Sequence, residues 1–303
     1  MTRSASLKAY AKINLGLRVL YKRPDGFHEL RTVFQTISLA DRIDVKFLRT
    51  RSTRIAIEGT PEIPDNLVER ATRLVLGELQ IHAEVGFEIR KNIPMGAGLG
   101  GGSSNAAAVL LSLPALAGKR IPVDRLATMA AQLGSDVPFF LYGGRALGLG
   151  RGEELYPLPA TGAGRGILVA PAIHSSTAEA YRDLSANLTS VGLQNKLGTF
   201  QQEIWGGGTG PAVNDFEDVV FGRHPELRGF RDRLARLGAK PAGMTGSGSS
   251  IFGLFEDRTK QDRAYRTLRK ELPEEKIFQF SFVSHTQYQS AWKRALNPDR
   301  TAR

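Results

Sequence analysis

Glycine and serine dominate one short segment of the chain, residues 94–104. Five of the seven residues from Gly96 to Gly102 are glycine, and the serines that follow lead into an alanine-rich run typical of a helix. A loop with few Cβ atoms lets several backbone N–H groups face one concavity, and the next helix adds the unpaired N–H groups of its first turn. Such a loop suits a polyanion, most often the phosphate chain of a nucleotide. The candidate phosphate-binding residues are Pro94, Met95, Gly96, Ala97, Gly98, Leu99, Gly100, Gly101, Gly102, Ser103 and Ser104.

Three familiar nucleotide-binding loops do not fit this segment. A Walker loop requires a lysine before its last hydroxyl residue, and no lysine follows Gly102. The dinucleotide fingerprint requires an acidic residue about 20 residues further on, whereas the nearest one downstream is Asp124, beyond two prolines. The segments typical of protein kinases are absent from the sequence. A flexible glycine linker remains the plain alternative, although a linker is not expected between an alternating strand and a helix.

Lysine, asparagine and aspartate occur at three further positions where chemistry is plausible. Lys12 and Asn14 are two residues apart in an alternating segment, so they project from the same strand face about 7 Å from each other. A solvated strand face is the alternative for that pair. Asp136 follows Gly134, where a helix is predicted to end, and an apolar run comes next. A carboxylate in this position is either a helix cap or a positioned base.

A second loop, residues 243–250, alternates glycines with hydroxyl-bearing residues ahead of the apolar strand 251–255. A hairpin turn would explain two glycines, but hydroxyls beside three glycines suggest another loop that faces a ligand. Two such loops, far apart in the sequence, predict a site in a cleft between two domains. The candidates in the second loop are Thr245, Gly246, Ser247 and Gly248.

Hydrophobic periodicity predicts the elements that position these residues. In the first half we expect strands over 9–19, 31–39, 43–48 and 85–91, and helices over 65–80, 103–113 and 124–134, the last capped by Asp124. In the second half we expect a strand over 167–170, a helix over 226–237, a strand pair within 242–255, a helix over 258–271 and a strand over 277–283. That second order is ferredoxin-like, so the chain is predicted to be α+β. A composition change near 157–166 predicts domains over 1–160 and 161–303, with a polar, variable excursion at 185–212 and a frayed tail from Lys293.

Composition limits the classes of function that remain. A length of 303 residues accommodates two ordinary domains, and the absence of cysteine excludes disulfides and thiolate metal sites. No apolar run reaches 18 residues and no signal peptide is recognisable, so we expect a cytoplasmic protein without a membrane segment. The net charge of +11 is spread along the chain, which favours steering of small anions over a nucleic-acid interface.

With these pieces placed, the chain resembles the GHMP small-molecule kinases. The segments that carry the resemblance, in the family's order, are residues 9–15, 23–30, 96–105, 134–140, 214–217 and 243–250. Within the superfamily, the likeness is greatest to the kinases of the non-mevalonate isoprenoid pathway. The resemblance implies an N-terminal ribosomal-protein-S5-like domain, a C-terminal ferredoxin-like domain and an active site in the cleft between them.

The resemblance also implies an activity and its catalytic residues. The reaction would be ATP-dependent phosphorylation of the 2-hydroxyl of a methylerythritol that carries a cytidine diphosphate group. Asp136 takes the position of the general base, Lys12 that of its paired cation, and the loop at residues 94–104 that of the ATP site. Mg²⁺ would neutralise the phosphate oxygens, with Ser104 as a candidate ligand.

Five residues match substrate-binding positions of the family. Asn14 matches a contact to the methylerythritol part, Phe27 and His28 match a cytosine pocket with Tyr181 opposite, and Thr177 matches a further substrate contact. Phe27 stands where the family more often has tyrosine, so ring stacking is retained and a phenolic hydrogen bond is not. Packing of a turn is the alternative for Phe27 and His28.

Two other functions stay open. The same chemistry could act on mevalonate, homoserine or a sugar, or the chain could bind nucleotides or RNA without catalysis. The expected partner is the small-molecule substrate, with no nucleic acid and no membrane, and the expected oligomeric state is a monomer or a weak homodimer.

Overall fold

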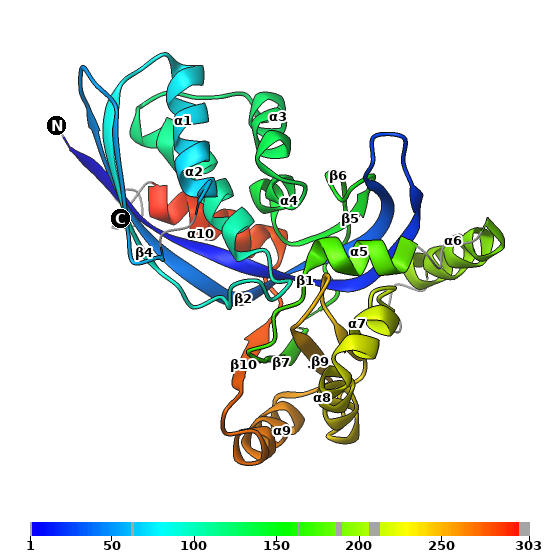
Figure 1. Cartoon of the computed structure of the whole chain (residues 1–303). Helices are drawn as coiled ribbons and strands as arrows, with labels where there is room; N and C mark the ends of the chain where they lie inside the picture. The colour runs from blue at the N-terminus through cyan, green and yellow to red at the C-terminus, as the bar shows by residue number, and fades with distance from the viewer. Residues whose placement is uncertain (1, 62–63, 163, 186–189, 206–212, 297–303) are drawn as a thin grey trace.

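Two β-sheets with helices packed on them make up the computed structural model, which describes residues 2–61, 64–162, 164–185, 190–205 and 213–296 (Figure 1). The first sheet has the order β3-β4-β2-β5-β6, and β1 pairs with β2 off this path. Its strands are β1 (Arg3–Lys22), β2 (His28–Arg49), β3 (Arg54–Glu58), β4 (Ala83–Arg90), β5 (Arg145–Leu149) and β6 (Glu154–Pro157).

The two longest strands, β1 and β2, form an antiparallel pair along most of their length. The strands predicted separately over 31–39 and 43–48 are both parts of β2. The register of the pair shifts between Tyr10 and Ala11 and again between Asn14 and Gly16. Such bulges re-aim side chains next to functional sites. Here they flank the segment that carries Lys12.

Five helices cover one face of the first sheet (Figure 1). They are α1 (Leu67–Leu79), α2 (Gly101–Leu116), α3 (Val123–Leu133), α4 (Val137–Tyr142) and α10 (His285–Leu296). Helix α2 is buried over most of its surface, and its alanines permit close packing against β1 and α1. The last helix, α10, inserts Tyr288 and Trp292 into this same core, so the end of the described chain returns to the first sheet.

The second sheet has the antiparallel order β10-β7-β9-β8. Its strands are β7 (Arg165–Ala170), β8 (Ala242–Met244), β9 (Ile251–Phe255) and β10 (Lys276–Ser281), with α8 (Pro225–Arg236) and α9 (Arg258–Glu271) packed on it. In chain order this is strand, helix, strand, strand, helix, strand, which confirms the ferredoxin-like prediction. Helices α5 (Thr177–Ser185), α6 (Ser190–Trp205) and α7 (Glu217–Arg223) lie between β7 and α8 in the chain.

Some local predictions are wrong or fall outside the described residues. Asp124 does not cap α3, because Pro122 occupies the N-cap position and Asp124 lies in the first helical turn. Within the predicted excursion, residues 190–205 are helical, whereas 186–189 and 206–212 lie outside the described residues. Helix α10 continues past the predicted start of the frayed tail, and residues 297–303 are also outside the description.

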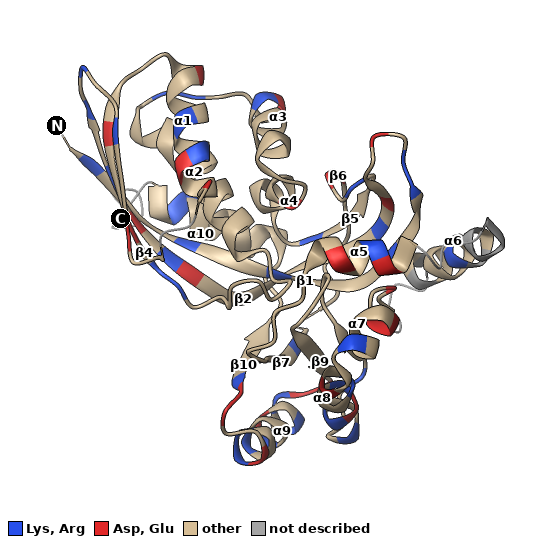
Figure 2. Cartoon of the chain, in the orientation of Figure 1, with Lys and Arg blue, Asp and Glu red and all other residues tan. Residues whose placement is uncertain are grey.

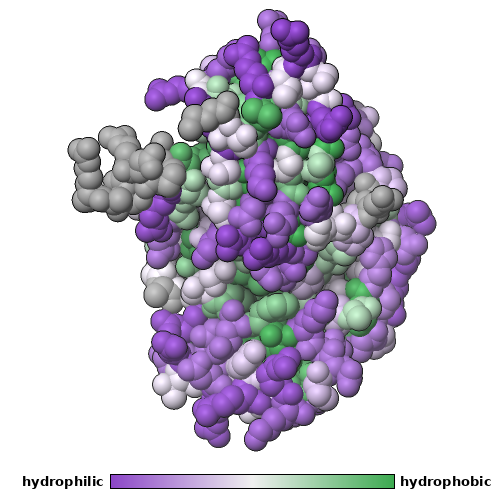
Figure 3. Space-filling view, turned by 90° about the vertical axis from the view of Figure 1, so that its left-hand side faces the viewer, coloured by the Kyte–Doolittle hydropathy of each residue, from purple (hydrophilic) through white to green (hydrophobic). Residues whose placement is uncertain are grey.

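Charged residues are distributed over both halves of the molecule (Figure 2). Among the described residues, lysine and arginine occur on helices and strands alike and do not gather in one block. The face shown in Figure 3 is largely hydrophilic, with apolar side chains in small separate groups. Among the described residues, no helix combines the length and the hydropathy needed to cross a bilayer.

Candidate active site

Lys12 and Asp136 meet from two different elements, β1 and the start of α4. Lys12 Nζ lies 3.4 Å from Asp136 Oδ2, with side-chain exposures of 5% for the lysine and 33% for the aspartate. A lysine is rarely this buried unless it is paired. Asp136 occupies the N-cap position of α4, but its side chain makes no capping hydrogen bond. The helix-cap alternative is therefore wrong, and the carboxylate remains accessible beside a buried cation.

Asn14 holds Lys12 in place from the same strand. Lys12 Nζ donates a hydrogen bond to Asn14 Oδ1 at 2.8 Å, and Asn14 Nδ2 donates to Thr32 Oγ1 at 2.7 Å. The Asn14 backbone N–H donates to Thr245 Oγ1 at 2.9 Å, which connects β1 to the second glycine loop. Since Lys12 and Asn14 are both buried, the alternative of a solvated strand face is wrong.

The glycine loop is a defined structure that lies against β1. The backbone N–H of Lys12 donates to the Leu99 carbonyl at 3.0 Å. Gly96, Gly98 and Gly100 have φ values of 66°, 74° and 69°, in the region that favours glycine. Gly100 is the N-cap of α2 and provides no side-chain cap, so the first-turn N–H groups are oriented for an anion.

The two glycine loops lie in direct contact. A Cβ added at Gly98 would clash with the carbonyl oxygen of Thr245, and one added at Gly246 would crowd the Gly98 backbone. Asn214 holds the second loop by donating to the carbonyl oxygens of Met244 and Gly246, at 2.9 and 2.8 Å. Segments about 150 residues apart in the sequence therefore form one surface.

A buried polar cluster that no sequence pattern predicted anchors the glycine loop. Asp41 is fully buried and accepts from the backbone N–H groups of Asn92 at 2.8 Å and Ile93 at 2.9 Å. It also forms an ion pair with Lys91. With its amide oriented to match its neighbours, Asn105 donates to Asp41 at 3.0 Å and accepts from Lys91 at 3.2 Å. This cluster ties the end of β4 to the start of α2, on either side of the loop.

Two cavities meet at the glycine loop. The first, the loop cavity, has a volume of about 350 Å³ and is bounded by the glycine loop, the start of α1 and Lys91. The second, the lysine cavity, has a volume of about 410 Å³ and is bounded by β1, the second glycine loop and α5. Both cavities are lined by Gly96, Gly98 and Gly100. Ligands in the two cavities would face each other across these glycines.

Most of the predicted site residues line these two cavities. The lysine cavity includes Lys12, Asn14, Asp136, Thr177, Tyr181, Gly246, Ser247 and Gly248. The loop cavity includes Pro94 to Ser103. Thr245 lies just behind the lysine cavity, where it contacts Asn14, and Thr177 Oγ1 lies 2.7 Å from Ser247 Oγ. Ser104 is buried, lines neither cavity, and its Oγ has no hydrogen-bond partner among the described residues.

Phe27 and His28 lie at the edge of the lysine cavity, because neither lines it but each contacts a residue that does, Arg151 or Tyr181. Phe27 is 53% exposed, so turn packing does not explain it, and the Arg151 guanidinium lies 4.6 Å from its ring centroid. The His28 ring stacks on Tyr181 with centroids 4.8 Å apart, and its Nε2 lies 2.7 Å from Ser185 Oγ. Burial, with a smaller contribution from Lys22, lowers the pKa of His28. Burial also raises the pKa of Tyr181.

Arg151 is a cavity residue that the sequence analysis missed. It lines the lysine cavity, its Nε donates to Glu153 Oε1 at 3.1 Å, and its guanidinium covers Phe27. It follows a glycine in the turn between β5 and β6, and no sequence pattern marks it. Arg151 adds a positive charge to the rim that Phe27 occupies.

Comparisons with known proteins agree with this geometry. Residues 66–144 match the model of the GHMP kinases N terminal domain, and residues 197–274 match that of the GHMP kinases C terminal domain. A curated relative from Solibacter usitatus, a 4-diphosphocytidyl-2-C-methyl-D-erythritol kinase, is 52% identical over 98% of this chain and 94% of its own length. A relative of the same name from Geobacillus kaustophilus is 39% identical over 87% of this chain and 92% of its own.

Solved structures give the same result. A crystal structure of 4-(cytidine 5'-diphospho)-2C-methyl-D-erythritol kinase superposes with a TM-score of 0.75 at 36% identity, over 93% of this chain and 99% of that one. Homoserine kinase from Cytophaga hutchinsonii has a TM-score of 0.72 at 19% identity, over 93% of this chain and 95% of that one, and shares the fold. The sequence identity extends over nearly the whole chain, so the chain belongs to the GHMP kinases, a family of ATP-dependent phosphotransferases.

Proposed function

We propose that the chain transfers the γ-phosphoryl group of ATP to the 2-hydroxyl of 4-diphosphocytidyl-2-C-methyl-D-erythritol, in isoprenoid precursor synthesis by the non-mevalonate pathway. The names of the relatives at 52% and 39% identity support this substrate. One observation carries the mechanism: two cavities meet at Gly96, Gly98 and Gly100, and the Lys12–Asp136 pair lies in only one of them. ATP would occupy the loop cavity and the alcohol the lysine cavity.

Asp136 acts as the general base in this proposal. The 2-hydroxyl must lose its proton as its oxygen bonds to phosphorus, and a half-buried, accessible carboxylate can accept that proton. Lys12 lies 3.4 Å from the carboxylate, close enough for its ammonium to stabilise negative charge on the attacking oxygen. Asn14 fixes the ammonium through its 2.8 Å hydrogen bond. In this proposal Asn14 also contacts the methylerythritol part of the substrate.

The glycine loop and the first turn of α2 bind the triphosphate through backbone N–H groups. Mg²⁺, when bound, neutralises the phosphate oxygens. Mg²⁺ at such sites is held largely by the phosphates and takes few protein ligands. The described residues contain no group of three His, Cys, Asp or Glu arranged for a metal, which fits a cation carried by the nucleotide. Ser104 Oγ remains the candidate protein ligand: it has no hydrogen-bond partner among the described residues, although it lines neither cavity.

The cytidine group is recognised at the edge of the lysine cavity. We place the cytosine ring on Phe27, with Tyr181 opposite and His28 at its polar edge. The His28 ring now covers Tyr181, so the base binds there only when His28 turns away. Stacking on an aromatic ring contributes about 1–3 kcal/mol per base, enough to select a cytidylyl substrate over the bare alcohol. Thr177 belongs to the same wall of the cavity.

Release of ADP by the purified chain tests this function. Reactions contain MgATP and either 4-diphosphocytidyl-2-C-methyl-D-erythritol, 2-C-methyl-D-erythritol 4-phosphate, mevalonate or homoserine. We expect turnover with the cytidylyl compound alone. Turnover with another acceptor would support kinase activity but contradict the proposed cytosine pocket. ATP binding without turnover on any acceptor would favour a non-catalytic nucleotide-binding protein.

We place the enzyme in the cytoplasm, as a monomer or weak homodimer without a nucleic-acid partner.

A further inference from the structure

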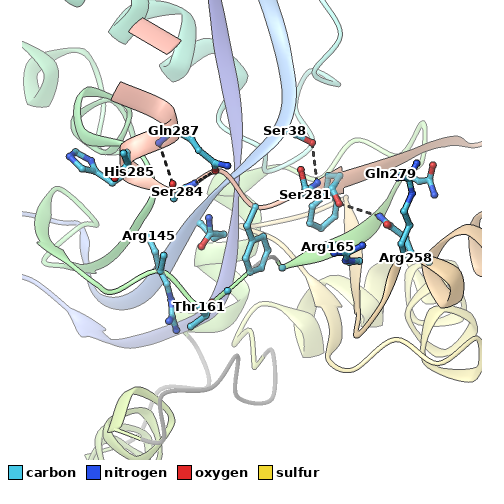
Figure 4. Close-up of a pocket in the computed structure, with 18 of the residues that line it drawn as sticks. Ser38, Arg145, Thr161, Arg165, Arg258, Gln279, Ser281, Ser284, His285 and Gln287 are labelled. Atoms are coloured by element: carbon cyan, nitrogen blue, oxygen red, sulfur yellow. Dashed lines mark hydrogen bonds between the residues drawn. The ribbon is translucent and has the colours of Figure 1, made fainter. Parts of the chain in front are cut away.

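A third cavity, of about 820 Å³, lies where the two sheets meet, and we call it the sheet-junction cavity (Figure 4). It shares no lining residue with the loop cavity or the lysine cavity. Strand β2 separates it from the lysine cavity. Phe34 of this strand lines the lysine cavity, whereas its neighbour Gln35 lines the sheet-junction cavity, as expected for adjacent residues on a strand. The kinase reaction proposed above makes no use of this space.

Arginine side chains give the sheet-junction cavity its charge. Arg145, Arg165 and Arg258 line it, and among the described residues that line it one carboxylate, that of Asp262, faces them. That carboxylate is already engaged, since it accepts from Gln279 Nε2 at 2.7 Å and lies 3.7 Å from Arg258 Nε. Figure 4 shows Arg145 beside Thr161 in one part of the cavity and Arg165 near Arg258 in another. The cavity therefore carries an excess of positive charge.

Two of the lining groups have unused hydrogen-bonding capacity. Arg165 Nε and Thr161 Oγ1 are buried and have no hydrogen-bond partner among the described residues. Unsatisfied buried polar atoms cost free energy, so both groups favour a partner that can accept or donate a hydrogen bond. Arg145 lies opposite Gln35 in the β2–β5 pair and is only 8% exposed. Burial lowers the pKa of Arg145, as expected for a cation in a part of the cavity wall that is shielded from water.

The start of helix α10 and two aromatic rings complete the sheet-junction cavity. Ser284 and the first residues of α10, up to Gln287, line it, and the positive end of a helix dipole favours an anion. Ser284 and Gln287 cap each other through hydrogen bonds of 2.9 and 3.2 Å, which fixes this turn (Figure 4). Phe280 and Phe282 add a stacked apolar wall, with ring centroids 6.4 Å apart. Cationic and apolar walls together suit an organic anion.

We propose that the sheet-junction cavity is a second ligand site, which takes a small organic phosphate distinct from the two substrates of the kinase reaction. Its phosphate group binds Arg165, because the planar guanidinium matches phosphate oxygens in a bidentate geometry. Its carbon portion lies on Phe280 and Phe282. Arg258, at the exposed rim, attracts the anion from solvent.

Calorimetric titration with inorganic diphosphate tests this site. The full chain is first saturated with ADP without Mg²⁺, so that the glycine loop is occupied. We expect diphosphate still to bind, the Arg165→Gln variant to weaken its Kd at least tenfold, and the matched variant Arg263→Gln to remain within twofold of the unsubstituted chain. Arg263 is an exposed residue of α9 that does not line the cavity. An unchanged Kd in Arg165→Gln would overturn the proposal.

If Arg165→Gln fails to fold, hydrogen–deuterium exchange of the unsubstituted chain tests whether diphosphate binds in the sheet-junction cavity. Under the same conditions we expect diphosphate to protect residues 158–162 and 279–287, which border the cavity. Protection confined to residues 94–104 and 243–250 would place the diphosphate at the glycine loops and overturn the proposal. The exposed substitution Arg258→Glu should weaken binding at least threefold without loss of the fold.

Discussion

Lys12 Nζ lies 3.4 Å from Asp136 Oδ2, although the two residues are 124 positions apart and belong to β1 and the N-cap of α4. The pair lines the lysine cavity together with Gly96, Gly98 and Gly100. Two contacts hold Lys12 there, the Asn14 amide on its ammonium and the Leu99 carbonyl on its backbone N–H, while Asp136 lies at the start of α4. The geometry of the pair is therefore set by β1, the glycine loop and the start of α4.

Substitution of Asn14 tests how the lysine is positioned. Asn14→Ala removes the 2.8 Å acceptor from the Lys12 ammonium and leaves Thr32 without its donor. We expect kcat to fall about tenfold and the free energy of unfolding to fall by about 1–3 kcal/mol, because buried polar groups lose partners. Steady-state kinetics and urea unfolding measure the two effects. Gln132→Ala, an exposed amide on α3, is the matched control and should change neither. An unchanged kcat in Asn14→Ala would show that Lys12 is positioned without this amide.

The sequence could predict those parts of the site whose residues are close together in the chain. The glycine loop, the second glycine loop and the turn at Asp136 were each recognisable within about ten residues, because loop chemistry is local. The ferredoxin-like order was also predictable, since each of its strands and helices has its own periodicity. Lys12 and Asn14 could be identified as neighbours on one strand face, but not as buried residues.

The remaining features depend on contacts between distant segments. The cluster of Asp41, Lys91 and Asn105 joins three elements, and none of these residues lies in a pattern that predicts its partner. Arg151 covers Phe27 from another pair of strands. Helix α10 packs on the first sheet even though it follows the strands of the second. Pairings of this kind are determined by tertiary packing, which local propensity does not encode.

Two glycines test whether contact between the loops is needed. Gly98→Ala would place a Cβ against the Thr245 carbonyl at a φ of 74°, so we expect the loops to separate and KM for ATP to rise at least tenfold. Gly77→Ala, in α1, meets nothing within 4 Å and has an ordinary φ. We expect Gly77→Ala to stabilise the fold by about 0.5–1 kcal/mol and to leave KM unchanged. Thermal unfolding and ATP kinetics on both variants make the comparison. Equal KM values in the two variants would mean that ATP binds without close contact between the loops.

The titration of His28 is a further test. Burial against Tyr181, and secondarily the charge of Lys22, lowers its pKa below the ordinary value of about 6.5. Between that value and the lower folded pKa, the unfolded chain binds more protons at this site, so stability should decrease as pH falls through this window. In NMR titrations, Lys22→Gln should raise the pKa of His28 without restoring the ordinary value, since burial remains. A folded-state pKa at or above 6.5 in the unsubstituted chain would contradict the packing of His28.

Phe27 tests the cytosine pocket without loss of fold. Its ring is 53% exposed, so Phe27→Ala should leave the unfolding temperature nearly unchanged. Loss of a stacking partner worth about 1–3 kcal/mol predicts a rise in KM for the cytidylyl substrate of roughly 5- to 150-fold, with KM for ATP unchanged. Phe27→Tyr should retain the KM of the unsubstituted chain. If Phe27→Ala also retained it, the base would have to bind elsewhere.

The most direct test of the mechanism is the turnover of Asp136→Asn with MgATP and 4-diphosphocytidyl-2-C-methyl-D-erythritol. This substitution keeps the shape of the side chain and removes its ability to accept a proton. We predict that kcat falls by about 10²- to 10⁴-fold, the range for loss of a general base, while the Kd for ATP stays within twofold. Asp218→Asn, an exposed residue of α7, should behave as the unsubstituted chain does. A kcat for Asp136→Asn within threefold of the unsubstituted value would contradict the assignment of Asp136 as the base.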